Sequence, residues 1–199
     1  MNLTIKKMSP ELAKDYFDFF DNRAFSDNSP FYPCYCNAFQ MTKAQLEKVF
    51  KEGKENGDDA EAFRIALRKS AVQMVEQNII QGYLAYDGDI SMGWCNANNR
   101  KNYTRVGEFN LDEVSDEVMD AVAPLSESMA FAQEGDLSSE QAENEEKIKS
   151  IVCFEIAPEY RGRGIATALL NRVCEDAVQA GFVRISQHGN DLIMQKKLK

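Results

Sequence analysis

The order of predicted elements in this chain of 199 residues favours a single α/β (α+β) domain. Three observations carry that prediction: a hairpin pattern at 82–95, an apolar strand at 150–156, and an amphipathic helix at 164–180. Apolar runs bounded by turn residues indicate strands, and apolar positions three to four residues apart indicate helices. A chain of this length can bury one real core, and no linker divides residues 1–199.

The first third of the chain predicts one strand and three helices. Leu3 to Met8 alternates like a half-buried strand, and Ser9-Pro10 then begins a helix that should end near Phe20. Residues 24–39 form a loop rich in Ser, Asn, Pro and aromatic residues. The further helices should begin at the capping box of Thr42 to Gln45 and at Ala60, the latter running to about Gln77.

The later elements are predicted from turn signals and apolar runs. Asp87-Gly88 is typical of a hairpin turn, and the second strand of that hairpin should end at Trp94-Cys95-Asn96. After the helix, residues 180–186 and 192–198 resemble the two strands of a closing hairpin. The alternative is a fifth strand at 182–186 followed by a short remainder. We favour the hairpin.

The net charge of −9 comes from one segment. Residues 108–146 contain 13 acidic and no basic residues, which leaves 19 acidic against 23 basic residues elsewhere. The mildly basic remainder gives no support to nucleic-acid binding. We interpret 108–149 as an acidic insertion, partly helical around 115–122. It could steer a cationic amine towards a site, or it could be a solvated loop.

The chain has the features of a cytoplasmic protein. It contains no apolar stretch of 18 residues, so we expect no membrane span, and its first residues contain no apolar signal core. Five cysteines suit a reducing compartment. Three of them, Cys95, Cys153 and Cys174, lie in apolar patterns typical of small core residues.

The most informative run is 151–170, where a strand enters a turn containing Gly162 and Gly164 and then a helix. Glycines allow close approach of the backbone to a ligand, and the first amides of a helix have no intrahelical acceptor. The helix dipole favours negative charge there, and Arg161 and Arg163 could add charge-assisted donors. The run therefore predicts an anion site. It lacks the ending of a nucleotide P-loop and the G-x-G-x-x-G pattern.

The spacing Arg161-x-x-Gly164-x-Ala166, after a strand ending in Ile156-x-Pro158-x-Tyr160, resembles the acetyl-coenzyme-A motif of GNAT N-acetyltransferases. The resemblance implies a mixed, mostly antiparallel twisted sheet flanked by helices. It also implies acetyl-CoA as co-substrate, no metal, and acetyl transfer to a primary amine of a small molecule or peptide. The cofactor would contact Phe154, Ile156, Arg161, Gly162, Arg163, Gly164, Ile165, Ala166 and Thr167.

Two other functions stay open at this point. The family usually has a further strand and helix after the cofactor helix, and that helix often carries a tyrosine acid. This sequence has no tyrosine after Tyr160, and its C-terminal region is short for the family. A non-catalytic acyl-CoA-binding or sensor module is therefore an alternative. An interaction domain that uses the acidic insertion is another. The oligomeric state is open, with a homodimer among the candidates.

Catalysis in such a domain needs a base and a polarised thioester carbonyl, and the family resemblance implies a bulge in the fourth strand that frees an N–H group. Glu155 is our candidate base, because partial burial late in a strand could raise its pKa. It could instead face solvent on the other side of the sheet, or an ordered water could relay the proton. No nucleophile is required, so Cys153 need not be catalytic.

The aromatic loop before the second helix is the candidate acceptor wall. Tyr32 and Tyr35 would supply flat area and hydroxyls, and Trp94 could line the same cleft or belong to the core. Cys34 and Cys36 have the spacing of a metal pair, but one histidine and no second pair favour buried thiols. That histidine, His188, is expected to be a turn residue.

Overall fold

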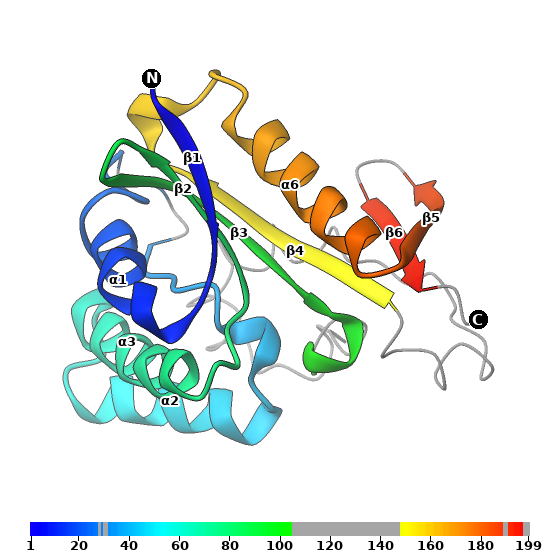
Figure 1. The fold of residues 1–199 in the computed structure, drawn as a ribbon. Coiled ribbons are helices and arrows are strands. Elements are labelled where there is room, and N and C mark those ends of the chain that lie inside the picture. The colour runs from blue at the N-terminus through cyan, green and yellow to red at the C-terminus, as the bar shows by residue number, and fades with distance from the viewer. Residues whose placement is uncertain (28, 30–31, 105–147, 189–190, 197–199) are drawn as a thin grey trace.

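The computed structural model describes residues 1–27, 29, 32–104, 148–188 and 191–196. Most of the predicted acidic insertion, including the expected helix at 115–122, lies outside these residues. The described parts form one sheet with helices packed on both of its faces (Figure 1).

The sheet has six strands in the order β1-β2-β3-β4-β6-β5. Every strand pair that the described residues form is antiparallel, which agrees with the mostly antiparallel sheet that was expected, although no parallel pair is among them. The reason is the position of β6, the last strand. It forms a hairpin with β5 and lies between β4 and β5, so β4 and β5 do not pair with each other. The strands are β1 (Leu3–Lys7), β2 (Gly82–Asp87), β3 (Ile90–Asn99), β4 (Ile148–Ile156), β5 (Phe182–His188) and β6 (Asp191–Lys196).

The helices lie close to their predicted positions. The proline at Pro10 begins a short 3₁₀ turn, Pro10–Leu12, before the first α-helix. The predicted capping box is confirmed: Gln45 N–H donates to the Thr42 hydroxyl, and Thr42 N–H donates to the Gln45 side chain at 2.8 Å. The α-helices are α1 (Ala13–Asn22), α2 (Lys43–Glu55), α3 (Ala60–Glu76) and α6 (Ile165–Gln179).

Two hydrophobic clusters hold the helices to opposite faces of the sheet. Leu84 and Trp94 pack with the α1–α3 side, whereas Tyr83 and Cys95 pack with α6. This alternation follows from the period of two residues in a strand. Figure 1 shows α1, α2 and α3 on one side of the sheet and α6 on the other.

Two strand ends differ from prediction. β3 continues to Asn99 rather than ending at Asn96, and the asparagines in this stretch find buried partners. Asn96 donates to the Cys36 carbonyl at 2.7 Å, and Asn98 donates to the Ile79 carbonyl at 3.2 Å. Polar residues whose hydrogen bonds are satisfied can continue a buried strand. His188 ends β5 rather than lying in a turn, and the predicted closing hairpin is confirmed.

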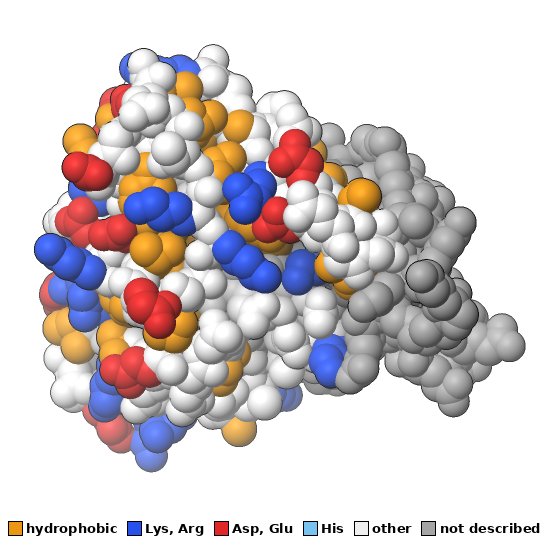
Figure 2. All heavy atoms as spheres, viewed as in Figure 1, with side chains coloured by type: hydrophobic (Ala, Val, Ile, Leu, Met, Phe, Trp, Pro, Cys, Tyr) orange, Lys and Arg blue, Asp and Glu red, His pale blue; other side chains and the backbone are white. Residues whose placement is uncertain are grey.

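The surface of the described residues carries mixed charge on the face turned to the viewer. Figure 2 shows Lys and Arg side chains interspersed with Asp and Glu there, without a large field of one sign. No helix in the described part of the chain is long and apolar enough to cross a membrane.

Candidate functional site

The turn between β4 and α6 has the backbone conformation that the glycine pattern predicts. Gly162 has φ 73° and Gly164 has φ 79°, values that L-residues rarely adopt. A Cβ atom added to either glycine would meet no atom within 4 Å. The glycines are therefore required by the backbone and not by close packing, and space lies directly in front of them.

The start of α6 leaves its amides open. Gly164 is the N-cap residue and offers no side-chain cap. Within the described chain, the N–H groups of 162–167 donate to no main-chain acceptor outside α6, whose first such bond is from Ala168 to Gly164. These N–H groups and the positive end of a 15-residue helix dipole are the groups that could hold the predicted anion.

Among the described residues, one edge of β4 has no strand partner next to that turn. β4 pairs with β3 from Lys149 to Ile156, but it pairs with β6 only at Ile148 and Lys149. Beyond Lys149, the hairpin of β5 and β6 no longer contacts this edge as a strand partner, and Figure 1 shows the hairpin beside the beginning of β4. Main-chain groups along the rest of the edge can therefore bind an extended ligand.

A β-bulge lies in the middle of β4, as predicted. Asn96 pairs with Cys153 and Ala97 pairs with Ile151, so Val152 is the extra residue. The side chains show the effect. Ile151 packs with the α6 cluster, whereas Cys153, two residues later, packs with the α1–α3 cluster. A regular strand would place both on one face, so the bulge reverses the alternation before the residues that enter the turn.

The two apolar candidate cofactor residues differ in exposure. Phe154 is 38 % exposed, which is unusual for a phenylalanine in a strand. Ile156 is partly buried, and it packs with Ile165 above Gly93, where a Cβ atom would lie 2.9 Å from Ile156 Cδ1. The Ile156 carbonyl already accepts from Arg161 Nε at 3.0 Å. Phe154 thus has free apolar surface, while Ile156 mainly supports the start of α6.

Glu155 is a partly buried acid beside this open edge. Its side chain is only 15 % exposed, so it does not extend into solvent as the alternative required. Burial raises its pKa to about 7, and the nearby Arg161 guanidinium opposes the rise. Arg161 Nη2 lies 3.4 Å from Glu155 Oε1. The expected rise in pKa is therefore present, and a carboxylate near neutrality can accept a proton.

The arginine side chains of the turn bind other groups of the protein in this structure, and their contacts with the cofactor stay a prediction. Arg161 donates to Asp27 Oδ2 at 2.6 Å as well as to Glu155, which joins the α1 loop to β4. Arg163 donates to the Glu159 carbonyl at 2.8 Å and lies over the Tyr160 ring. In this structure both arginine side chains stabilise the turn. Among the described groups, the donors left without an acceptor at the turn are the main-chain N–H groups.

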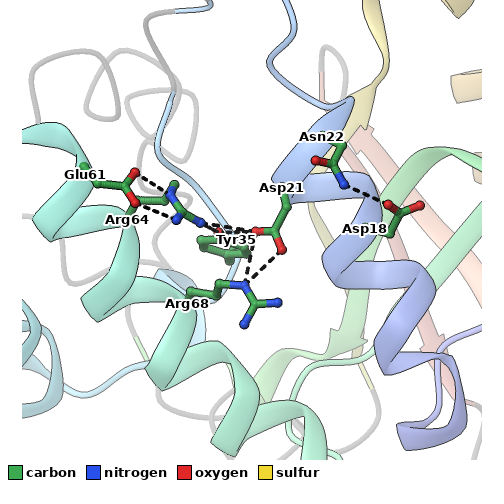
Figure 3. Close-up of polar contacts among 7 residues, drawn as sticks. All are labelled: Asp18, Asp21, Asn22, Tyr35, Glu61, Arg64 and Arg68. Carbon is green, nitrogen blue, oxygen red and sulfur yellow. Dashed lines mark hydrogen bonds and ion pairs between the residues drawn. The ribbon is translucent and has the colours of Figure 1, made fainter.

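The three aromatic acceptor candidates differ in exposure. Tyr32 is 40 % exposed and Phe25 is its ring neighbour. Tyr35 is only 2 % exposed, and its hydroxyl donates to Asp21 and accepts from Arg64, as Figure 3 shows. Trp94 has no exposed surface and packs edge-on against Tyr16. A substrate could reach Tyr35 or Trp94 only if the core opened, so Tyr32 alone is accessible.

An open hollow between α1 and α3 lies away from this site. Its lining residues are Asp21, Asn22, Arg64, Ile65, Arg68 and Lys69. These helices cover the face of the sheet opposite to α6, and the hollow does not include the glycine turn. Among the described residues, no group of three or more His, Cys, Asp or Glu side chains is arranged to hold a metal ion.

The comparisons address the same stretch of chain. Residues 129–191 match the acetyltransferase (GNAT) family. This confirms the resemblance that the Arg161-x-x-Gly164 motif indicated, and among the described residues the match covers β4, the turn, α6 and β5. The GNAT match supports an acyltransferase. No curated protein matches the chain.

Two solved structures are similar to the chain at low identity. A candidate acetyltransferase from Pyrococcus horikoshii has 15% sequence identity and a TM-score of 0.44, with 98% of this chain and 97% of that chain covered. The PaiA N-acetyltransferase from Thermoplasma acidophilum, in complex with coenzyme A, has 11% identity and a TM-score of 0.31, with both chains fully covered at 100%.

Two features of the site were absent from the sequence prediction. Asp27, which binds Arg161, and the contact of Cys36 with Cys153 both join the loop after α1 to β4. The two cysteines are 117 residues apart, and no local pattern connects them. The Cys34-x-Cys36 spacing was the available signal, and it indicates thiols close together without naming their third partner.

Proposed function

We propose that this protein transfers an acetyl group from acetyl-CoA to a primary amine of a small-molecule or peptide acceptor. The amine would attack the thioester directly. The observation that carries the proposal is the start of α6, where amides 162–167 have no main-chain acceptor in the described part of the chain, next to the edge of β4 that lacks a described strand partner. The GNAT match over this stretch supports it.

The residues at the turn fit the diphosphate of coenzyme A. Unpaired amides at a helix N-terminus bind phosphate, and no atom lies within 4 Å of the Cβ positions of Gly162 and Gly164 to obstruct one. The main chain of β4 beyond Lys149 would hold the pantetheine arm, with the exposed Phe154 ring as an apolar contact. When bound, acetyl-CoA supplies an activated acetyl thioester. The bulge at Val152 is the part of the strand suited to orient an N–H group towards its carbonyl oxygen.

Glu155 is proposed as the general base. An amine acceptor is mostly protonated at neutral pH, so a proton must leave before attack. A carboxylate whose pKa is about 7 can take that proton directly or through a water. Ionisation of Glu155 increases as pH rises through 7, so we expect the rate to rise over the same range and then to level. Cys153 has no required role in this reaction.

The acceptor would approach from the side of the loop after α1. That loop carries Tyr32 and Asp27, and Asp27 reaches the site through Arg161. A carboxylate and an exposed tyrosine suit a cationic amine. We place the enzyme in the reducing cytoplasm, because all five cysteines are described and none forms a disulfide.

Turnover separates this function from its main alternative. Free thiol release from acetyl-CoA should be measured with a panel of amines that includes polyamines, amino acids, aminoglycosides and peptides with a free amino terminus. We expect release that depends on both the amine and the protein. Tight coenzyme A binding without release for any amine would contradict acetyl transfer and favour an acyl-CoA sensor. Absence of coenzyme A binding would contradict both.

A further inference from the structure

Three cysteine thiols meet beside Glu155, between the loop after α1 and strand β4. Cys36 Sγ lies 2.9 Å from Cys153 Sγ, and Cys36 N–H donates to Cys34 Sγ at 3.2 Å. Cys36 therefore touches both of the others. The acetyl transfer proposed above needs no thiol on the protein, so this cluster has no role in that reaction.

The three thiols differ in access and in acidity. Cys36 is only 3 % exposed, whereas Cys34 and Cys153 are partly exposed. Hydrogen bonding from the Cys36 thiol and from its backbone N–H lowers the pKa of Cys34, against the effect of burial. Hydrogen bonding to Cys153, followed by that to Cys34 and by burial, raises the pKa of Cys36 well above its usual range. The thiolate is the reactive form, so Cys34 is the thiol that an oxidant would attack first.

The other two cysteines have different surroundings. Cys95 is fully buried in the α6 cluster, and burial raises its pKa. Cys174 packs beside Ala177 and Phe182 at the end of α6. Cys95 and Cys174 serve as internal references, because they meet the same oxidant in the same protein but lie outside the three-thiol cluster.

We propose that Cys34, Cys36 and Cys153 form a peroxide-sensitive thiol site whose product is a Cys36–Cys153 disulfide. This inference does not depend on acetyl transfer. The Sγ contact between Cys36 and Cys153 places the two final partners together in the reduced protein. The contacts of Cys36 with both neighbours allow the oxidation to pass from Cys34 to the Cys36–Cys153 pair.

The steps balance with hydrogen peroxide as the oxidant. The Cys34 thiolate attacks one peroxide oxygen, the O–O bond breaks, and hydroxide leaves as water after protonation, which gives a Cys34 sulfenic acid. The Cys36 thiol then attacks the Cys34 sulfur, which forms a Cys34–Cys36 disulfide and releases water. Cys153 attacks the Cys36 sulfur and releases Cys34 as a thiol. In total, two thiols and one peroxide become one disulfide and two waters.

The product would join two parts of the candidate active site. Cys153 follows the bulge at Val152 and comes two residues before Glu155, and Cys36 belongs to the loop that carries Tyr32 and Tyr35. A covalent bond between positions 117 residues apart removes freedom from the unfolded chain. Oxidation would therefore stabilise the protein while holding this loop against β4.

The test counts thiols in the full chain before and after peroxide. The protein is treated with hydrogen peroxide, denatured, alkylated and measured by intact mass, and the linked peptides are then sequenced. We expect five alkylated cysteines before treatment, three after it, and five again after dithiothreitol, with Cys36 joined to Cys153. Five alkylated cysteines after treatment, or a bond that involves Cys95 or Cys174, would overturn the proposal.

Two variants test the order of the steps. Cys34→Ser should slow disulfide formation at least about tenfold and leave the same Cys36–Cys153 product, because the thiol whose pKa is lowered is then absent. An unchanged rate would contradict the role of Cys34. Cys174→Ser is the matched control. The number of its cysteines that can be alkylated should fall by two on oxidation, at the wild-type rate. Because the product is mapped in the wild-type protein, the proposal stays testable if a variant folds poorly.

Discussion

Three helices of this protein begin in two opposite ways. At α2, Thr42 and Gln45 exchange side-chain and main-chain hydrogen bonds, and at α3 the Asp59 carboxylate accepts from Ala62 N–H at 2.8 Å. At α6, Gly164 has no side chain to offer, and the preceding turn adds further open amides. The starts of α2 and α3 satisfy N–H groups with their own side chains, whereas the start of α6 leaves its N–H groups available to a ligand.

The difference teaches how a helix end can serve stability or binding. A side-chain cap typically contributes about 1 kcal/mol to stability, and α6 gives this up while also holding two glycines at positive φ. Such a loss makes sense where an anion supplies the missing acceptors. The open edge of β4 and the raised pKa of Glu155 lie beside α6, whose start is uncapped.

The largest effect should follow from Gly164→Glu. The substitution forces an L-residue to φ 79° and adds a negative charge where the diphosphate should bind. We expect coenzyme A affinity to fall at least about 1,000-fold, or about 4.1 kcal/mol, by titration calorimetry.

Gly88→Glu is the matched control for that substitution. Gly88 also has positive φ, 59°, and open space around it, but it lies in the hairpin turn between β2 and β3. It should bear the same strain and charge with coenzyme A affinity near that of wild type. Equal losses in the two variants would mean that backbone strain, and not the anion site, explains the result.

Glu155→Gln should lower the rate of acetyl transfer about 100-fold, because an amide cannot accept the proton. Coenzyme A affinity should change little, since the side chain is not among the proposed cofactor contacts. Steady-state rates from pH 5.5 to 9 should also lose the rise in rate near pH 7, the acid limb, that we expect for the wild-type protein. Glu159→Gln, an exposed neighbour, should keep both the rate and the limb. A wild-type pH profile for Glu155→Gln would remove Glu155 from the mechanism.

Arg161→Ala should shift the rise in rate near pH 7, the acid limb of the profile, rather than abolish it. The Arg161 guanidinium favours the charged form of Glu155 and so holds its pKa down against burial. Without it, the pKa of Glu155 rises and the limb shifts towards higher pH, by about one unit for about 1.4 kcal/mol of lost interaction. Arg163→Ala, which removes contacts to Glu159 and Tyr160, should leave the limb in place. A shift towards lower pH for Arg161→Ala would contradict this account.

The smallest effect is expected at the capped helix. Thr42→Ala removes the acceptor for Gln45 N–H and should lower the free energy of unfolding by about 1 kcal/mol in urea titrations. Coenzyme A affinity should not change. Thr42→Ser, which keeps the hydroxyl, is the control. A change in coenzyme A affinity with Thr42→Ala would contradict the claim that a capped helix start serves stability and the uncapped start of α6 serves binding.

Local signals predicted most of the fold. The capping box at Thr42, the Asp87-Gly88 turn and the glycine turn before α6 each act within a few residues, so the sequence alone indicates them. The predicted bulge is also present in β4. The strand end at Asn99 was missed because the partners that satisfy its buried asparagines come from Cys36 and Ile79, distant in sequence.

The site was predicted in part for the same reason. The conformation of the glycine turn depends on its own backbone, so the sequence predicted it, and anion binding there stays a prediction. The position of Glu155 depends on the bulge, and that of Arg161 depends on Asp27 in another loop. Tyr35 and Trp94 could not be separated from core residues beforehand, because aromatic side chains are common both in cores and in binding sites.

A crystal structure with coenzyme A tests the central claim most directly. We predict that the diphosphate accepts hydrogen bonds from main-chain N–H groups of 162–167 at the start of α6, with the pantetheine arm along β4 beyond Lys149. Coenzyme A bound elsewhere, for example in the hollow between α1 and α3, with these amides still open, would contradict the account.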